Sequence, residues 1–137
     1  MDPATKINWV SALRSDQYKQ GKNVLLDING NYCCLGVLCE INKLTKIIEN
    51  KLIIFEHSYN SETSRNIYHL PITLQRELNL NSNLVFVKKE LVKGLYSEKF
   101  SKLDFRKSVS DVVFLTTLND NDFTFHEIAN IIEQSDI

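Results

Sequence analysis

The sequence predicts an α+β fold, a single compact domain over residues 1–137 with three or four helices packed on a small antiparallel sheet. Apolar residues recur at helical spacing near both ends of the chain, and short runs rich in β-branched residues lie between them. An Asn-Gly pair also follows one of these runs. Of the 137 residues, 43% are hydrophobic and 24% are charged, so one core can form without disulfide or metal crosslinks.

A first helix is expected at the start of the chain. Asp2 followed by Pro3 is typical of a helix N-terminus, because Asp accepts hydrogen bonds from free backbone N–H groups and Pro fits the first helical position. Gly21 can end a helix in the left-handed conformation. We therefore expect this helix to run from Pro3 to Gln20.

A hairpin is expected next. The run Val24–Ile28 ends at an Asn-Gly pair, a strong hairpin signal because both residues tolerate positive φ. The return strand should begin at Asn31, and the chain should change from strand to helix near Cys33 or Cys34.

The middle of the chain is interpreted from short apolar runs, which are ambiguous between strand and helix. We expect a strand at Lys51–His57, a polar loop at Tyr59–Asn66, and pairing back across that loop by Ile67–Leu70. Pro71 then opens a short helix, and Leu84–Val87 is another strand-like run. Residues 88–107 alternate charged and aromatic side chains and give no clear prediction.

The C-terminal part is predicted to be helical. Val109–Leu118 fits a helix or a buried strand, and a helix is favoured. Thr124 and Glu127 have the spacing of a capping box, in which each side chain accepts a hydrogen bond from the other residue's backbone N–H. The expected core residues are Trp9, Leu13, Leu26, Cys34, Leu35, Leu38, Leu74, Phe125, Ile128 and Ile132.

All three cysteines lie within seven residues, at positions 33, 34 and 39, among Leu and Val. An odd, clustered set does not make a disulfide framework, and no neighbouring cation would lower a thiol pKa. Cys34 and Cys39 have a spacing that zinc tolerates, but no histidine pair of zinc-binding spacing accompanies them. We therefore expect buried free thiols, with no catalytic residue, no metal and no cofactor.

Charge is distributed unevenly along the chain. Residues 88–107 hold seven basic and three acidic residues, a balance of +4, and the rest hold nine and fourteen, a balance of −5. This segment either attracts an anionic partner or is an ordinary solvated face. The chain is not basic enough for a protein that binds duplex nucleic acid. Aromatic and cationic residues that could bind a small anionic or nucleotide-like ligand are Arg14, Tyr18, Lys19, Tyr59, Arg65, Tyr68 and Arg106.

No run of eighteen apolar residues is present, which predicts no membrane association, and the polar N-terminus lacks the apolar core of a secretion signal. We expect a cytoplasmic protein.

Several motifs resemble a family of small uncharacterised proteins of tailed bacteriophages and prophages. The pattern comprises a W-x2-A-L-R-S motif at Trp9–Ser15, a Y-C-C-L-G-V-L-C motif at Tyr32–Cys39 and an L-N-D motif at Leu118–Asp120. This family usually has a glycine soon after the L-N-D motif, where this chain has Asn121 and Asp122. The resemblance implies an accessory protein acting in the cytoplasm of a bacterial host, and it supplies no reaction or ligand.

Three functions remain open from the sequence. The leading hypothesis is a non-enzymatic phage-type binding protein, such as an antagonist of host defence that sequesters a small nucleotide-like signal or blocks a host protein. The alternatives are a cysteine- or histidine-dependent enzyme and a phage structural or assembly adaptor. A ligand site at an interface between copies would make the protein a homo-oligomer.

Overall fold

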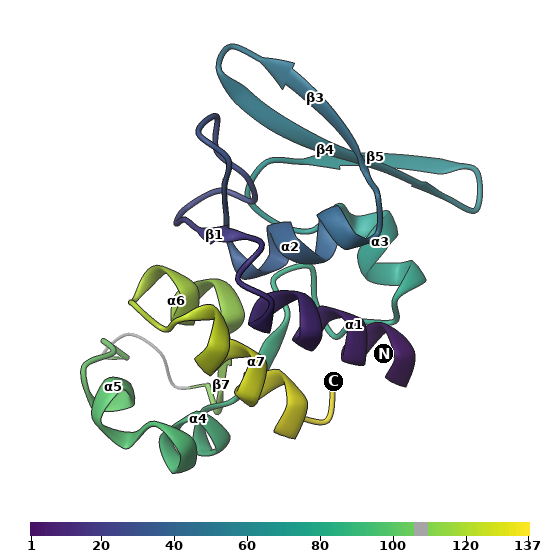
Figure 1. The fold of residues 1–137 in the computed structure, drawn as a ribbon. Coiled ribbons are helices and arrows are strands. Elements are labelled where there is room, and N and C mark those ends of the chain that lie inside the picture. The colour runs from purple at the N-terminus through teal and green to yellow at the C-terminus, as the bar shows by residue number, and fades with distance from the viewer. Residues whose placement is uncertain (106–109) are drawn as a thin grey trace.

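The computed structural model describes residues 1–105 and 110–137, and it confirms the α+β class (Figure 1). Across the described residues, the helices are shorter and more numerous than the three or four expected. In chain order, the elements are α1 (Pro3–Arg14), β1 (Lys19–Gln20), β2 (Asn31–Tyr32), α2 (Cys34–Ile41), β3 (Thr45–Glu49), β4 (Leu52–Tyr59), β5 (Glu62–Asn66), α3 (Ile72–Glu77), β6 (Phe86–Lys88), α4 (Lys89–Leu95), α5 (Ser97–Ser101), β7 (Val112–Phe114), α6 (Leu115–Asp120) and α7 (Phe125–Gln134).

The described strands form three small sheets. β3, β4 and β5 make an antiparallel sheet in that order, β6 and β7 make an antiparallel pair, and β1 and β2 make a parallel pair. Both hairpins of the three-stranded sheet turn on two residues of positive φ, at Asn50-Lys51 and Asn60-Ser61. Such turns match the right-handed twist of the strands, which makes this sheet a local meander.

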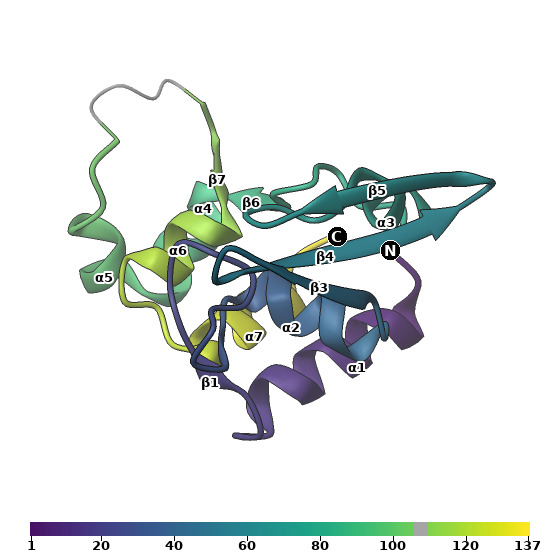
Figure 2. The same ribbon diagram turned by 90° about the horizontal axis from the view of Figure 1, so that it is seen from above.

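Helix α2 is the centre of the molecule. Figures 1 and 2 show it between the three-stranded sheet on one side and α1 with α7 on the other. Six of its eight residues, from Cys34 to Cys39, are buried. A helix that is apolar on all sides is stable only where other elements surround it, and this explains why the cysteines are interleaved with Leu and Val.

Gly36 brings another part of the chain into contact with α2. A Cβ atom at this position would lie 1.8 Å from the carbonyl oxygen of Leu25, so only glycine lets that backbone cross the helix. The same Leu25 oxygen accepts a hydrogen bond from Cys33 N–H at 3.1 Å. The glycine of the cysteine motif is therefore required by packing.

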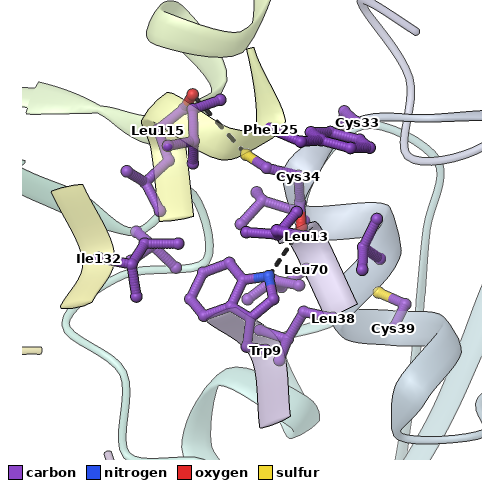
Figure 3. Packing of buried hydrophobic residues seen from close by; sticks show 14 of the residues in the cluster. Trp9, Leu13, Cys33, Cys34, Leu38, Cys39, Leu70, Leu115, Phe125 and Ile132 are labelled. Carbon is purple, nitrogen blue, oxygen red and sulfur yellow. Dashed lines mark hydrogen bonds between the residues drawn. The ribbon is translucent and has the colours of Figure 1, made fainter. Parts of the chain in front are cut away.

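All ten expected core residues are buried. Trp9 is fully buried, and its indole Nε1–H donates to the carbonyl oxygen of Cys34 at 3.0 Å (Figure 3). The Cys34 thiol in turn lies 3.8 Å from the carbonyl oxygen of Leu115. Helices α1, α2 and α6 are thus joined at one buried point by polar contacts inside an apolar core.

The predicted end of the first helix is wrong. α1 ends at Arg14, because the Ser15 hydroxyl bonds the carbonyl of Ala12 and Asp16 adopts a φ of 61°. Gly21 has a different role, since a Cβ there would lie 2.7 Å from the Cβ of Asn31. It permits the close approach of the two segments that pair as β1 and β2.

Several predictions for the hairpins are also wrong. The expected strand Val24–Ile28 is reduced to a single bridge between Leu26 and Tyr32, although Gly30 has positive φ as expected. The expected polar loop contains strand β5, whose polar residues pair with β4. Ile67–Leu70 does not pair across it, because the Ile67 carbonyl accepts a hydrogen bond from Leu25 N–H.

Of the two C-terminal predictions, the capping box is confirmed and the single favoured helix is only partly right. Both hydrogen bonds of the capping box at Thr124 and Glu127 are present at the start of α7. The stretch Val109–Leu118, expected to be one helix or one strand, instead forms β7 and the first part of α6 in its described residues. Val109 lies outside the described residues.

Candidate functional site

A hollow of about 230 Å³ lies beside the N-terminus of α2. Its walls come from four separate parts of the chain: the loop before β2, the residue that precedes α2, the segment between β5 and α3, and helix α6. The residues that line it are Asn23, Val24, Cys33, Tyr68, His69, Thr116 and Asp120. Among these are an imidazole, a carboxylate, a thiol and a phenol, so this hollow brings together four kinds of functional group.

The segment that carries Tyr68 and His69 is held by one side chain. The Oδ1 atom of Asn66 accepts hydrogen bonds from the backbone N–H groups of the next three residues, at 2.9, 3.0 and 3.1 Å. Ile67 is anchored through its carbonyl to Leu25 N–H at 2.9 Å. Both side chains are therefore presented by a preformed backbone, which lowers the entropy cost of binding.

The opposite wall is fixed by a buried asparagine. Asn119 is fully buried; its Oδ1 accepts from Gln20 Nε2 at 3.0 Å and from Cys34 N–H at 3.2 Å. Its Nδ2 donates to the carbonyl of Gly21 at 2.8 Å and to Asp120 Oδ1 at 3.2 Å. The L-N-D motif thus places a hub residue next to the carboxylate that lines the hollow.

Asp120 is positioned by neighbours on two elements. Its Oδ1 atom accepts from the backbone N–H of Asn23 at 3.1 Å, besides the bond from Asn119. Both of these hydrogen bonds fall on Oδ1, and Oδ2 takes part in neither of them. A carboxylate held in this way is a directional acceptor for N–H donors.

His69 is the one lining residue with an unsatisfied buried atom. Its Nδ1 is buried and has no hydrogen-bond partner among the residues that the structure describes. Because an unpaired buried polar atom costs about 1–3 kcal/mol, such groups are rare and are typical of functional positions. Because no described residue bonds Nδ1 and fixes the tautomer, this imidazole can donate or accept at Nε2.

The thiols do not have the properties of nucleophiles. Cys33 is 3% exposed, and burial raises its pKa to about 11, although the backbone N–H groups of Leu35 and Gly36 partly oppose this shift. Burial likewise raises the thiol pKa of Cys34 and of Cys39. All three are free cysteines. They are neutral at physiological pH, whereas a reactive cysteine needs a thiolate.

No group of three or more His, Cys, Asp or Glu side chains is arranged to hold a metal ion in the part of the chain that the structure describes. Cys33, His69 and Asp120 line one hollow, yet they do not form such a group. What the hollow offers a ligand is therefore a set of hydrogen-bonding groups and an aromatic ring.

Two of the cationic residues expected to bind an anion are engaged in ion pairs within the protein. Arg14 forms an ion pair with Glu133 at 2.9 Å and donates to Asn130 at 2.6 Å, which ties α1 to α7. Arg65 forms an ion pair with Glu56 at 2.6 Å across β4 and β5. Lys19 is exposed on β1.

The expected aromatic residues are also spread over the fold. Tyr18 packs edge-on against Tyr32, with ring centroids 5.2 Å apart, and Tyr59 is exposed at the end of β4. Tyr68 is 51% exposed and lines the hollow. Arg106 lies outside the described residues. Of the seven expected ligand residues, the structure thus places Tyr68 at this hollow.

The basic segment is partly engaged in internal contacts. The described part of this segment includes α4 and α5, where Lys99 forms an ion pair with Glu127 at 2.5 Å and Lys89 lies over the ring of Phe105. The first contact connects α5 to the start of α7. Part of the local positive charge therefore stabilises the fold.

Four polar residues of the hollow were not predicted from the sequence: Asn23, His69, Thr116 and Asp120. Two of them belong to stretches that already carried a prediction, because His69 follows Tyr68 and Asp120 ends the L-N-D motif. The motif therefore pointed to Asp120, but nothing in the spacing could show that residues 23, 69 and 120 meet in space.

Together, the fold and the hollow define a small α+β domain with a preformed recess that both polar and apolar groups line. The chain belongs to the family described as a domain of unknown function (DUF8296), whose model matches residues 1–136. No curated protein and no solved structure matches the chain. None of the described helices combines the length and the apolar character needed to cross a lipid bilayer.

Proposed function

We propose that this protein is a non-enzymatic binding protein that captures a small nucleotide-like ligand in the hollow beside α2. The observation that carries this proposal is the imidazole of His69, which stands in the wall of a preformed recess with its buried Nδ1 unpaired. Since Nδ1 is closed to solvent in the free protein, we expect a bound ligand to turn the imidazole towards the recess and to supply the hydrogen bond that it lacks.

Burial of the sulfur atoms favours binding over catalysis. The thiol of Cys33 reaches the hollow but stays protonated, because burial raises its pKa, so it acts there as a small apolar surface. The carboxylate and the imidazole are then hydrogen-bonding groups of a recognition site.

The biological setting of the proposal rests on the resemblance to small phage proteins. A phage-encoded binding protein in the bacterial cytoplasm has a direct use in sequestering a signal that activates host defence. Such a protein must bind its ligand tightly and be present in large amounts, and it need not catalyse a reaction. These requirements agree with the properties of the site.

Native mass spectrometry tests the proposal. The purified protein is incubated with a small-molecule extract of bacterial cells and exchanged into volatile buffer, and its intact mass is then measured. We expect an added small-molecule mass on the wild-type protein and none on His69→Ala. The matched control is His126→Ala, because His126 is exposed and contacts Asp16 far from the hollow. A wild-type protein that retains no ligand, or a His69→Ala variant that retains it fully, contradicts the proposal.

The second candidate is a cysteine- and histidine-dependent enzyme, since Cys33 and His69 line the same hollow. It requires a thiolate at neutral pH. We expect iodoacetamide to modify the folded protein far more slowly than the urea-unfolded protein. Rapid alkylation of Cys33 in the folded state would favour the enzyme over the binding protein.

A further inference from the structure

We infer that the hollow binds a nucleobase through its amino edge and leaves any phosphate outside. The inference rests on the proposed function and gives the chemical class of the ligand. It follows from three properties of the lining residues: their charge, their aromatic surface and the size of the recess.

The charge of the hollow excludes phosphate as the group that is recognised. Among the described residues, its lining contains a carboxylate, Asp120, and neither Lys nor Arg. The nearest lysine in sequence, Lys22, forms an ion pair with Asp122 at 2.6 Å. The negative carboxylate of Asp120 would repel a phosphate placed beside it, and no cation of the described lining residues would compensate. Phosphate sites in proteins use Arg, Lys or clustered backbone N–H groups.

A carboxylate instead selects N–H donors. The two hydrogen bonds to Asp120 fall on Oδ1, so Oδ2 can accept from the exocyclic amino group of a base. Glu and Asp accept from such amino groups when proteins read base edges. His69 can hydrogen-bond to the ring atom of the base beside that amino group, whether this atom is a donor or an acceptor, because its imidazole can donate or accept.

The aromatic surface and the volume fit a single ring system. Tyr68 is half exposed and adjacent to His69, with their ring centroids 6.4 Å apart. Bases stack on aromatic side chains in many nucleic-acid sites. A volume of about 230 Å³ lies below the range of about 300–1,000 Å³ that holds drug-sized ligands. The recess therefore suits a base, while sugar and phosphate stay in solvent.

Calorimetric titration of the full chain with guanosine, adenosine, cytidine, uridine and inorganic phosphate tests the inference. We expect at least one amino-bearing nucleoside to bind, uridine to bind more weakly, and inorganic phosphate not to bind. Asp120→Asn should weaken nucleoside binding about tenfold, because it keeps the acceptor for Asn23 but loses the charge. Tyr68→Ala should weaken it by a similar factor.

Each variant has a matched control elsewhere on the surface. Asp122→Asn changes an exposed carboxylate that contacts Lys22, and Tyr59→Ala removes an exposed tyrosine on β4. Both controls should bind like the wild-type protein. Circular dichroism of Asp120→Asn should match the wild type, so that a loss of affinity is not a loss of fold.

Three results would overturn the inference: inorganic phosphate binds and nucleosides do not, nucleoside affinity is unchanged by Asp120→Asn, or no nucleoside binds. Native mass spectrometry distinguishes this failure from failure of the proposed function. A retained ligand that is lost in His69→Ala would keep the binding protein and reject the nucleobase as its ligand.

Discussion

The surroundings of helix α2 and the hollow at its N-terminus share residues, but they differ in whether their buried polar groups have hydrogen-bond partners. Around α2 the side chains are apolar, and the polar groups inside, such as Trp9 Nε1 and Asn119, have hydrogen-bond partners. In the hollow, His69 keeps a buried nitrogen without a partner among the described residues. The two polar groups named in the first region are hydrogen-bonded within the protein, whereas we propose that a bound ligand completes the hydrogen bonding of the imidazole in the second.

The difference predicts how substitutions separate stability from binding. Changes around α2 should destabilise the protein, because its groups have no alternative partners. Changes in the hollow should leave the fold intact or strengthen it, because natural proteins commonly lose stability to keep functional groups in place.

The largest effect is expected at Gly36. In Gly36→Ala the added Cβ would approach the Leu25 carbonyl oxygen to 1.8 Å, so the crossing segment must separate from α2. We expect a loss of about 4 kcal/mol in the free energy of unfolding, measured by urea denaturation. Gly94→Ala in α4 is the control, because a Cβ added there would have no described atom within 4 Å. The Gly94→Ala change should be neutral or stabilising. Equal losses in the free energy of unfolding in both variants would contradict the close crossing of the Leu25 backbone over α2.

Asn119→Ala should have the next largest effect. It removes one acceptor of Gln20 Nε2, the acceptor of the buried Cys34 N–H and the donor to the Gly21 carbonyl, and it leaves the Cys34 N–H without its bond to Asn119 in a buried position. We expect a loss of about 3 kcal/mol. The control Asn121→Ala removes one exposed bond to the Thr117 carbonyl and should cost less than about 0.5 kcal/mol. A loss at position 119 as small as this would show that it is not a hub.

Alkaline pH should weaken the α2 region through its thiols. Burial raises the pKa of Cys33 from 9.0 to about 11, so the unfolded chain releases this proton at lower pH than the folded chain. The stabilising effect is complete below pH 9 and is lost as the pH rises from 9 towards 11, by about 2 kcal/mol. Urea denaturation under reducing conditions at about pH 8 and about pH 11 measures it. Between these two pH values, Cys33→Ala should lose less stability than the wild-type protein, by the amount that the Cys33 thiol contributes. A Cys33→Ala variant with the pH dependence of the wild type would show that this thiol is not the cause.

The smallest effect should have the opposite sign. His69→Leu replaces the unpaired imidazole by an apolar side chain, and we expect a gain of about 1 kcal/mol in the free energy of unfolding. Ligand binding should be lost in the same variant. Thermal denaturation with and without the extract ligand measures both, and a destabilised His69→Leu would mean that the imidazole is a structural group.

Local features of the fold were predictable where a few adjacent residues decide the structure. The start of α1 at Asp2, the change to helix at Cys34 and the capping box at Thr124 are set by neighbours within four residues, and all three are confirmed. The end of α1 was not predictable, because Asp16 adopts its left-handed conformation where the chain turns back along the core. Strand β5 was hidden by its polar composition, since its stability comes from pairing with β4.

The candidate site likewise includes a residue that the sequence indicated and depends on contacts that the sequence could not indicate. Tyr68 was among the expected ligand residues and does line the hollow. Arg14 and Arg65 were chosen with it because cations attract anions, but their positions next to Glu133 and Glu56 are set by helix packing and strand register. No spacing along the chain indicates that these acidic residues lie opposite them.

Hydrophobic patterning and helix capping act over short distances along the chain, so the α+β class, the ten core residues and the burial of the three thiols could be read from the sequence. The recess could not, because its lining residues Asn23, Cys33, His69 and Asp120 lie up to 97 positions apart. Packing of α2, α6 and the segment after β5 brings them together and leaves the imidazole of His69 without a partner among the described residues. Contacts of that range arise from the folded arrangement as a whole, and no local pattern encodes them.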